Sequence, residues 1–293
     1  MNPEFSVVIP TYNRGLILAR CLDSLVRQTF KNFEVIISDD GSTDNTDEIV
    51  DLFKDKLCIQ YLRNKHWGGA ARPRNIGIKA ARAGWICFLD SDDWWYPEKL
   101  SICRNYTDRF NLIYHDLDMY NDPGKATIGK LKSRKLGKNV FLDLLNNGNS
   151  IGNSSVVVKK ELLERVGGIS EERELLLYQD YDCWLRIAGI EDRFHYVSKS
   201  LGAYWIDTDR PVNWEKISTA MEHLRKKYIE ALRDEDKKNY NRRLLYQLGK
   251  VHENLHEEKK AIDYYKISIK SNSLKLKFNS VFRLLFAYLK LRF

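Results

Sequence analysis

Short, almost uninterrupted apolar runs alternate with helical patterns through residues 5–89 of this 293-residue chain. Continuously apolar strands are buried on both faces, and the helices between them provide the cover, which is the pattern of a parallel sheet. The predicted strands are residues 5–10, 33–38, 57–62 and 85–89, and the predicted helices are residues 14–29, 46–53 and 74–82. The sequence therefore predicts an α/β fold in which helices flank a mostly parallel sheet.

The pattern is less regular after residue 90. Gly, Asn, Lys and Asp are frequent in residues 118–150, which we predict to be mobile loops around one short helix. Long, charged helical stretches begin near residue 213, so we expect a domain boundary there. The remaining predicted elements are a helix at 140–145, a strand at 154–158, a helix at 160–166 that Gly167 and Gly168 would end, and a helix that opens at Gln179.

Polar and acidic residues follow three of the predicted strands at the point where each strand ends. Thr11–Arg14 follow the first strand, Asp39–Ser42 follow the second, and Asp90–Asp93 follow the fourth. Ligands of such sheets bind beyond the carboxyl ends of the strands. We therefore expect the three loops to form one binding site.

The segment Asp90–Asp93 places three carboxylates within four positions. Crowded carboxylates repel one another, and a bound cation relieves the repulsion. Hard oxygen ligands in an Asp-x-Asp arrangement suit Mg²⁺ or Mn²⁺ and leave positions open for substrate phosphates. The alternative that these residues alone allow is a solvated loop with an aspartate at a helix N-cap.

The distribution of charge along the chain indicates which class of binding partner to expect. The net charge is +8, yet seven Lys or Arg residues and no acid follow Asp263, which leaves 8 − 7, or +1, for the rest. The basic character is therefore local, which argues against a nucleic-acid-binding protein and for an anionic partner of the C-terminal segment.

Several features predict a cytoplasmic protein. Five scattered cysteines without a Cys-x-x-Cys pair indicate a reducing compartment. Met1 is followed almost at once by the first strand, which leaves no room for a signal peptide. No apolar run approaches the roughly 20 residues that a membrane span needs.

Taken in order along the chain, these motifs resemble the family 2 glycosyltransferases of the GT-A fold, of the kind that builds bacterial surface polysaccharides. The matching stretches are Phe5–Arg14, Gln28–Asp44, Arg74–Gly77, Phe88–Asp93, Val166–Gly168 and Gln179–Arg186. The resemblance implies an inverting, metal-dependent enzyme. It would move a sugar from a nucleotide-diphosphate donor, most often a UDP-sugar, to a glycan or lipid-linked acceptor in polysaccharide or glycolipid synthesis.

The resemblance assigns donor-binding roles to the first two loops. Asp40 matches the position that accepts a hydrogen bond from the uracil N–H, although an Asx turn with Gly41 would also explain an aspartate here. Thr11 and Tyr12 match the loop that packs around the base, and Arg14 belongs to the same donor-binding loop.

The resemblance also assigns the groups around the diphosphate. Asp92 would bind Mn²⁺ or Mg²⁺ directly, and Asp90 would contact the ribose or the metal. Asp93 would either support these groups or cap the next helix. Arg74 matches a basic position near the donor, with Arg72 as a competitor, because a guanidinium binds phosphate oxygens in a bidentate manner.

An inverting single displacement needs one general base for the acceptor hydroxyl. The resemblance gives this role to Asp180, although the family carries Glu-Asp or a similar pair where this chain has Gln179. Asp182 is the competing carboxylate, but two residues along a helix it points away from Asp180. A second departure lies at Asp207, where many relatives carry a histidine in a Tyr-Arg-x-His segment; Asp207 would either supply an oxygen ligand to the metal or be an ordinary loop residue.

The C-terminal third is predicted to be helical. Residues 245–273 resemble one tetratricopeptide-like hairpin that would need a neighbour such as 212–232, and an ordinary helical hairpin explains them equally well. Residues 274–293 form a basic amphipathic helix suited to an anionic membrane surface, unless its apolar face packs on the protein's own helices or on another subunit. The predicted domains are thus a catalytic domain at 1–212, a helical extension at 213–273 and the amphipathic helix at 274–293.

Two rival functions stay open at this stage. Another nucleotide-sugar enzyme or a nucleotidyltransferase would lack a base such as Asp180, and its first loop would usually be rich in Gly and Lys. A catalytically inactive GT-A-like binding protein would explain Gln179 and the missing histidine, but the retained Asp90, Asp92 and Asp180 oppose it. We expect a peripheral enzyme on the inner face of the cell membrane.

Overall fold

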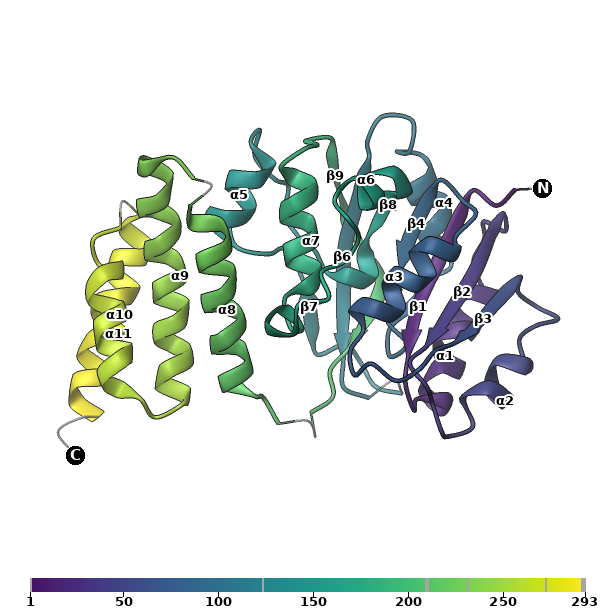
Figure 1. The fold of residues 1–293 in the computed structure, drawn as a ribbon, viewed down its shortest axis with the longest axis horizontal. Coiled ribbons are helices and arrows are strands. Elements are labelled where there is room, and N and C mark those ends of the chain that lie inside the picture. The colour runs from purple at the N-terminus through teal and green to yellow at the C-terminus, as the bar shows by residue number, and fades with distance from the viewer. Residues whose placement is uncertain (1, 123, 209–210, 231, 272, 291–293) are drawn as a thin grey trace. The chain divides into compact units, whose positions relative to one another are not determined.

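The structure is a computed structural model that describes residues 2–122, 124–208, 211–230, 232–271 and 273–290. These residues form two compact units, drawn in Figure 1. The first unit consists of the described residues up to Phe141, Asn149–Glu171 and the described residues from Gln179 to 208. The second consists of Leu142–Gly148, Glu172–Tyr178 and the described residues from 211 onward.

The first unit is built on one sheet with the strand order β3-β2-β1-β4-β8-β6-β9-β5, and β7 pairs with β6. The neighbours β3, β2, β1 and β4 are parallel, as are β6 and β9, whereas β8 is antiparallel to both β4 and β6. The strands are β1 Phe5–Thr11, β2 Phe33–Asp39, β3 Ile59–Arg63, β4 Trp85–Phe88, β5 Trp94–Trp95, β6 Leu112–Tyr120, β7 Gly129–Leu131, β8 Val157–Lys159 and β9 Phe194–Trp205. Because β4 and β6 are both antiparallel to β8, their carboxyl ends lie at the same edge as that of β1.

Helices cover the sheet on both faces. Val7 and Ile9 of β1 join the core that includes Leu18 and Leu22 of α1, whereas Val8, on the other face, packs against Gly77 of α3. A Cβ at Gly77 would lie 2.5 Å from Val8 Cγ1, so only glycine lets α3 approach β1 this closely. The helices are α1 Gly15–Val26, α2 Thr46–Asp51, α3 Ala71–Ala80, α4 Lys99–Arg104, α6 Lys160–Arg165 and α7 Gln179–Ala188, and the 3₁₀ turn η1 is Asn153–Ser155.

The predicted α/β fold with a mostly parallel sheet is confirmed, but the prediction of loops over residues 118–150 is partly wrong. That segment contains the end of β6 and all of β7, and neither β5 nor the twelve residues of β9 were predicted. Residues 154–158 were predicted as strand, whereas residues 153–155 form the turn η1 and the strand begins at Val157.

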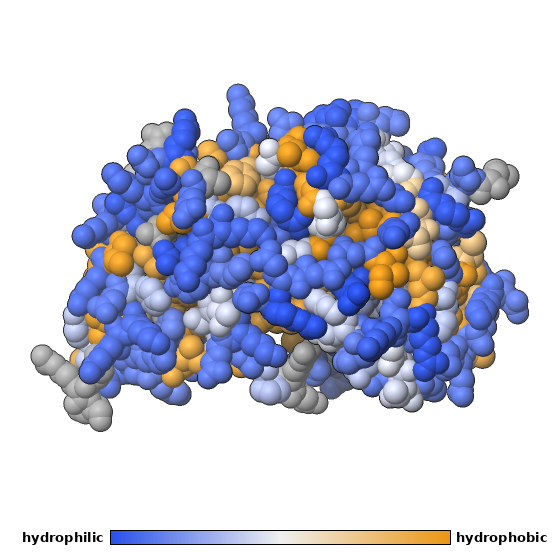
Figure 2. Space-filling view, viewed as in Figure 1, coloured by the Kyte–Doolittle hydropathy of each residue, from blue (hydrophilic) through white to orange (hydrophobic). Residues whose placement is uncertain are grey.

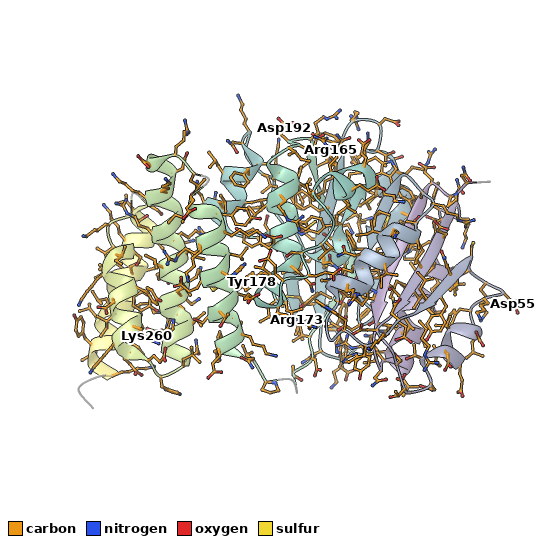
Figure 3. All side chains as sticks on the ribbon, in the orientation of Figure 1. Asp55, Arg165, Arg173, Tyr178, Asp192 and Lys260 are labelled. Carbon is orange, nitrogen blue, oxygen red and sulfur yellow. The ribbon has the colours of Figure 1, made fainter. Side chains whose placement is uncertain are left out.

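The second unit is helical. Within it α8 Trp214–Ile229 packs on α9 Asp234–Asn254, α9 packs on α10 Glu258–Ser268, and α10 packs on α11 Leu274–Lys290. Two further segments belong to this unit. One is residues 142–147 of α5 Val140–Asn147, and the other contains the 3₁₀ turn η2 Arg173–Leu175 and ends at Tyr178. Figure 3 labels Arg173, Tyr178 and Lys260, the last of which lies on α10. A Cβ at Gly249 would lie 2.5 Å from the Tyr265 ring, which explains how α9 and α10 approach so closely.

Helix α11 is attached to its neighbours by small and polar residues. Ser280 and Ala287 are buried, the Ser268 hydroxyl donates to Ser280 Oγ at 2.7 Å, and Arg283 Nη1 lies 2.8 Å from Glu253 Oε2. Most of its large apolar residues stay exposed: Leu274, Phe278, Val281, Phe282, Leu285, Phe286, Tyr288 and Leu289. On the face that Figure 2 draws, hydrophobic side chains reach the surface among hydrophilic ones over the C-terminal helices. The last three residues of the predicted helix, 291–293, lie outside the described residues.

Among the residues that the structure describes, no helix combines the length and the apolar character that crossing a bilayer requires.

Candidate active site

The loops after β1 and β2 are joined by hydrogen bonds. Asn13 has a φ of 49°, a left-handed conformation that asparagine tolerates better than most residues. In this conformation its N–H donates to Ser42 Oγ at 2.8 Å, and its Oδ1 accepts the N–H of Thr43 at 2.7 Å. The two predicted donor-binding loops therefore form one structure at the edge of the sheet.

The predicted base-binding residues gather beside a third loop, which no sequence motif indicated. Asp40 is buried and accepts the N–H groups of Trp67 and Gly68, each at 2.8 Å. The His66 ring stacks on the Tyr12 ring with centroids 4.2 Å apart, and both side chains are partly exposed. No local motif marks His66, because only the fold brings residues 66–68 against Asp40.

The side chains of Asp40 and Thr11 differ in their hydrogen bonding. Gly41 has a φ of 86°, but within this turn it is Asp39 Oδ1 that accepts the Ser42 N–H, at 2.9 Å, whereas the Asp40 carboxylate accepts from residues 67 and 68. Thr11 Oγ1 is buried and has no hydrogen-bond partner among the described residues. A carboxylate has lone pairs beyond those two bonds, so Asp40 retains acceptor capacity for a ligand.

Asp90 and Asp92 are each paired with an arginine. Arg74 Nη2 lies 2.5 Å from Asp90 Oδ1, and Arg14 forms an ion pair with Asp92. Arg74 is 5% exposed on α3, whereas the competing Arg72 is exposed. The structure thus brings Arg74, and not Arg72, to the acidic loop.

Asp93 is a buried support of this loop. Its carboxylate accepts the Ser154 hydroxyl at 2.5 Å and the N–H of Trp205 at 2.8 Å. Burial, with the neighbouring Asp92 and Asp90, raises the pKa of Asp93 well above its ordinary value. Asp93 therefore ties the loop to the end of β9, and α4 begins too far along the chain, at Lys99, for Asp93 to be its cap.

Arg20 supports the same loop from α1. Its Nη2 donates to the Asp92 carbonyl oxygen at 2.7 Å, and its guanidinium lies 4.2 Å and 4.7 Å from the ring centroids of Trp94 and Trp205. Such cation–π contacts orient a guanidinium as well as stabilising it. No sequence motif indicated Arg20, because an arginine in an amphipathic helix is usually a solvated surface residue.

Asp180 lies in the first turn of α7, in electrostatic contact with Arg74 and Asp90. Burial raises the pKa of Asp180 to about 6; the nearby Arg74 opposes this rise, and Asp90 adds to it. A carboxylate with a pKa near 6 is ionised at neutral pH and still basic enough to accept a proton.

Asp182 has a different environment. It is fully buried and forms an ion pair with Arg186, whose Nε lies 2.7 Å from Asp182 Oδ2. Arg186 also donates to the Gly168 carbonyl oxygen at 2.8 Å, so this pair holds α7 against the turn after α6. Asp182 is thus engaged in holding the fold.

Tyr204, in the penultimate position of β9, lies among the acidic groups. Burial raises the pKa of its hydroxyl to about 12, with further contributions from Asp93, Asp90, Asp92 and Asp180. Asp207, three residues further on, is exposed. Within the described ranges, no three His, Cys, Asp or Glu side chains are grouped as a metal site.

The acidic loop nevertheless fits a metal that arrives with a ligand. Mg²⁺ is usually held by one or two carboxylates together with substrate phosphates rather than by a complete protein cage. Asp92 and Asp90 can supply those carboxylates, because both are partly exposed, at 24% and 27% of their side chains.

Comparison with known proteins identifies the class. The profile of the family described as Glycosyl transferase family 2 matches residues 6–165, which is more than half of the chain. The chain belongs to glycosyltransferase family 2 and is a glycosyltransferase.

Curated relatives resemble the chain to different extents. An uncharacterized glycosyltransferase of Haemophilus influenzae is 28% identical over 284 residues, which cover 92% of each chain. The Escherichia coli UDP-Glc:alpha-D-GlcNAc-diphosphoundecaprenol beta-1,3-glucosyltransferase WfaP is 30% identical over 190 residues, covering 64% of this chain and 72% of WfaP. An uncharacterized glycosyltransferase of Rickettsia felis is 39% identical over 146 residues, or 49% of this chain, but the matched part is only 24% of that protein.

Solved structures share the fold. The crystal structure of S. aureus TarS 1-349 in complex with UDP has a TM-score of 0.69 and 21% identity, covering 98% of this chain and 89% of TarS 1-349. The mannosyltransferase PcManGT from Pyrobaculum calidifontis, in complex with GDP-Man and Mn²⁺, has a TM-score of 0.61 and 16% identity, covering 98% and 81%. At these identities the likeness shows the GT-A fold.

Proposed function

We propose that this glycosyltransferase is an inverting, metal-dependent enzyme that moves a sugar from a UDP-sugar to a glycan or lipid-linked acceptor in surface polysaccharide or glycolipid synthesis. One observation carries the proposal. Asp180, a carboxylate with a raised pKa, lies within range of the charge of Arg74, and Arg74 forms an ion pair with Asp90, the first aspartate of the Asp-x-Asp segment. This arrangement supports a general base next to the groups that would hold a sugar diphosphate.

The donor would lie across the carboxyl ends of β1, β2 and β4. Thr11, Tyr12 and Asp40 would contact the base, and the Tyr12–His66 stack offers an aromatic surface for it. Arg14, Arg74 and Asp90 would contact the diphosphate and ribose. Neighbours of the same fold have been solved with UDP and with UDP-GlcNAc, which supports a uridine donor.

Mn²⁺ or Mg²⁺ would be held by Asp92, with Asp90 beside it, and Asp207 is retained as a proposed further ligand. When bound, the metal neutralises charge on the leaving diphosphate. PcManGT, which shares the fold, was solved with Mn²⁺, which supports this choice of cofactor.

Asp180 would act as the general base. It accepts the proton of the acceptor hydroxyl while that oxygen forms a bond to the anomeric carbon, and the bond between this carbon and the diphosphate oxygen breaks with inversion. The products are the glycosylated acceptor and UDP. Asp182 is an unsuitable base, because its carboxylate is fully buried and paired with Arg186.

A donor screen tests this proposal. The full chain is mixed with UDP-sugars, UDP and GDP-mannose, with and without Mn²⁺, and thermal stabilisation is measured. A ligand at a hundred times its Kd should stabilise the protein by about 2.7 kcal/mol. We expect stabilisation by UDP ligands that requires the metal; stabilisation by GDP-mannose alone, or by no nucleotide, would contradict the proposed donor.

We further propose that the enzyme works at the inner face of the cell membrane through α11. Phe278, Phe282 and Leu285 are 74%, 62% and 60% exposed, and the nearby Lys275 and Lys290 are also exposed. An apolar face flanked by cations suits the surface of an anionic bilayer. WfaP, by its name, uses a diphosphoundecaprenol-linked acceptor, and a lipid-linked acceptor would require such proximity.

Substitutions on the exposed face of α11 test membrane binding without removing the helix. Phe278→Ser with Phe282→Ser should greatly reduce co-sedimentation with vesicles that contain phosphatidylglycerol. The control, Leu52→Ser, changes a residue of the first unit that is 66% exposed and should leave sedimentation unchanged. If a second copy of the chain covers this face instead, the double variant will change the mass in solution and not the vesicle binding, which would contradict the membrane proposal.

A further inference from the structure

Three arginines converge on the Asp-x-Asp segment from different parts of the first unit. Arg74 on α3 pairs with Asp90, Arg14 pairs with the Asp92 carboxylate, and Arg20 on α1 donates to the Asp92 carbonyl oxygen. Each carboxylate that would bind a metal is therefore already neutralised by a guanidinium.

Two of these arginines are held in place by their surroundings. Arg74 is 5% exposed, and its charge also acts on Asp180. Arg20 is flanked by the rings of Trp94 and Trp205, and its hydrogen bond is to a backbone oxygen, which a metal at the carboxylate does not displace.

Arg14 differs from both. It follows β1 in a loop, next to Asn13 with its left-handed φ, and it precedes the first residue of α1. The side chains of Arg14 and Asp92 are 32% and 24% exposed, so water reaches both members of the pair. Ion pairs in such surroundings contribute little to stability and are readily exchanged for stronger partners.

The charges favour one particular exchange. The charges of Asp90, Asp92, Arg14 and Arg74 sum to zero, and so do those of the neighbouring Arg20 and Asp180, so a divalent cation alone would leave the site positive and a sugar diphosphate alone would leave it negative. Bound together, the cation and the two negative charges of the diphosphate balance each other. A phosphate group also offers the paired oxygens that a guanidinium binds best.

We propose that Arg14 exchanges partners: it neutralises Asp92 in the free enzyme and moves to the donor diphosphate when the metal takes its place on Asp92. This inference rests on the proposed function. Arg14 would pair first with the Asp92 carboxylate and then with the diphosphate. This exchange would make binding of the metal and binding of the nucleotide strongly cooperative. Because coupling is reciprocal, each ligand raises the affinity for the other.

Measurements of Mn²⁺ affinity with and without UDP distinguish the two proposed roles of Arg14, as the partner of Asp92 and as the partner of the diphosphate. Electron paramagnetic resonance of unbound Mn²⁺ gives the affinity of the full chain for Mn²⁺ alone and for Mn²⁺ in the presence of UDP. Arg14→Met should strengthen the binding of Mn²⁺ alone by about fivefold, because Asp92 is freed from a partly exposed ion pair. The same variant should weaken the binding of Mn²⁺ with UDP, because the diphosphate loses a guanidinium.

A matched variant controls for net charge. Arg72→Met removes one exposed cation from α3 and should change neither affinity appreciably. The signature of exchange is the pair of opposite signs in Arg14→Met; a folding defect would weaken both affinities. If Arg14→Met weakens or leaves unchanged the binding of Mn²⁺ alone, or fails to weaken binding with UDP, the exchange is wrong. If the unaltered protein binds no Mn²⁺ with UDP, the proposed function itself fails.

Discussion

The two halves of the sheet differ in how plainly the sequence encodes them. β1 to β4 were predicted within a few residues, whereas β5, β6, β7 and β9 were mostly missed. In the first half β1, β2 and β4 are parallel and almost entirely buried, so their sequences are mostly apolar, whereas the edge strand β3 is only partly buried. The second half is held by side chains that are polar and far apart along the chain, and local hydropathy cannot detect such pairings.

β6 shows the physical reason. His115, Asp116 and Asp118 interrupt its apolar pattern, yet Asp116 is buried and accepts the N–H of Ser133 at 2.7 Å and the Tyr196 hydroxyl at 2.8 Å. Buried polar groups are tolerated when they are hydrogen-bonded. The partners are 17 and 80 residues away, so they become evident only in the folded chain.

The residues of the candidate site also fall into two groups, those that the sequence predicted and those that only the structure revealed. Asp40, Asp90 and Asp92 were predicted because loops after parallel strands meet at one edge, whereas Arg74 and Asp180 were predicted from the resemblance to family 2 glycosyltransferases. Arg20 and His66 were missed, because an arginine in a helix and a histidine in a loop carry no local signature. The role of Asp93 as an anchor also required the structure, since its partner Trp205 is 112 residues away.

The largest expected effect concerns the first half of the sheet. Asp92→Ala should abolish transfer and the metal-dependent part of nucleotide binding, because the proposed metal loses its main ligand. Transfer assays and UDP binding with and without Mn²⁺ test this. Full activity in excess EDTA would show that the reaction needs no metal and would remove the reason for the prediction.

Asp180→Asn tests the second half. Donor affinity should stay nearly unchanged while turnover falls by on the order of 10²-fold or more, as loss of a general base predicts. Asp182→Asn serves as the comparison and should chiefly lower stability, because it breaks a buried ion pair with Arg186. If Asp182→Asn were the variant with intact fold and lost turnover, the assignment of the base would be wrong.

Arg74 links the two halves, so its removal should affect both. Arg74→Met leaves Asp90 without its partner and should weaken UDP binding by about tenfold, the usual scale for a lost charged hydrogen bond. It also removes the cation that holds down the pKa of Asp180, so half-maximal activity should move to higher pH. An unchanged pH midpoint in this variant would separate Arg74 from Asp180.

The smallest effect on activity is expected at the buried anchor of β6. Asp116→Ala leaves the Ser133 N–H and the Tyr196 hydroxyl without their acceptor and should lower the free energy of unfolding by about 1–3 kcal/mol. UDP affinity at temperatures well below unfolding should be unaltered. Urea denaturation measures the first quantity, and Tyr196→Phe, which removes one donor only, should cost less; equal stability of Asp116→Ala and the unaltered protein would contradict this account of β6.

The pH dependence of kcat/KM tests the central claim, that Asp180 is the base, most directly. A base acts when deprotonated, and burial raises the pKa of Asp180 to about 6, so activity should fall about tenfold for each pH unit below that value. Asp180→Asn should lose this acidic limb and keep a low activity that does not vary across the same range. A limb near pH 6 that persists unchanged in Asp180→Asn would show that another group is the base.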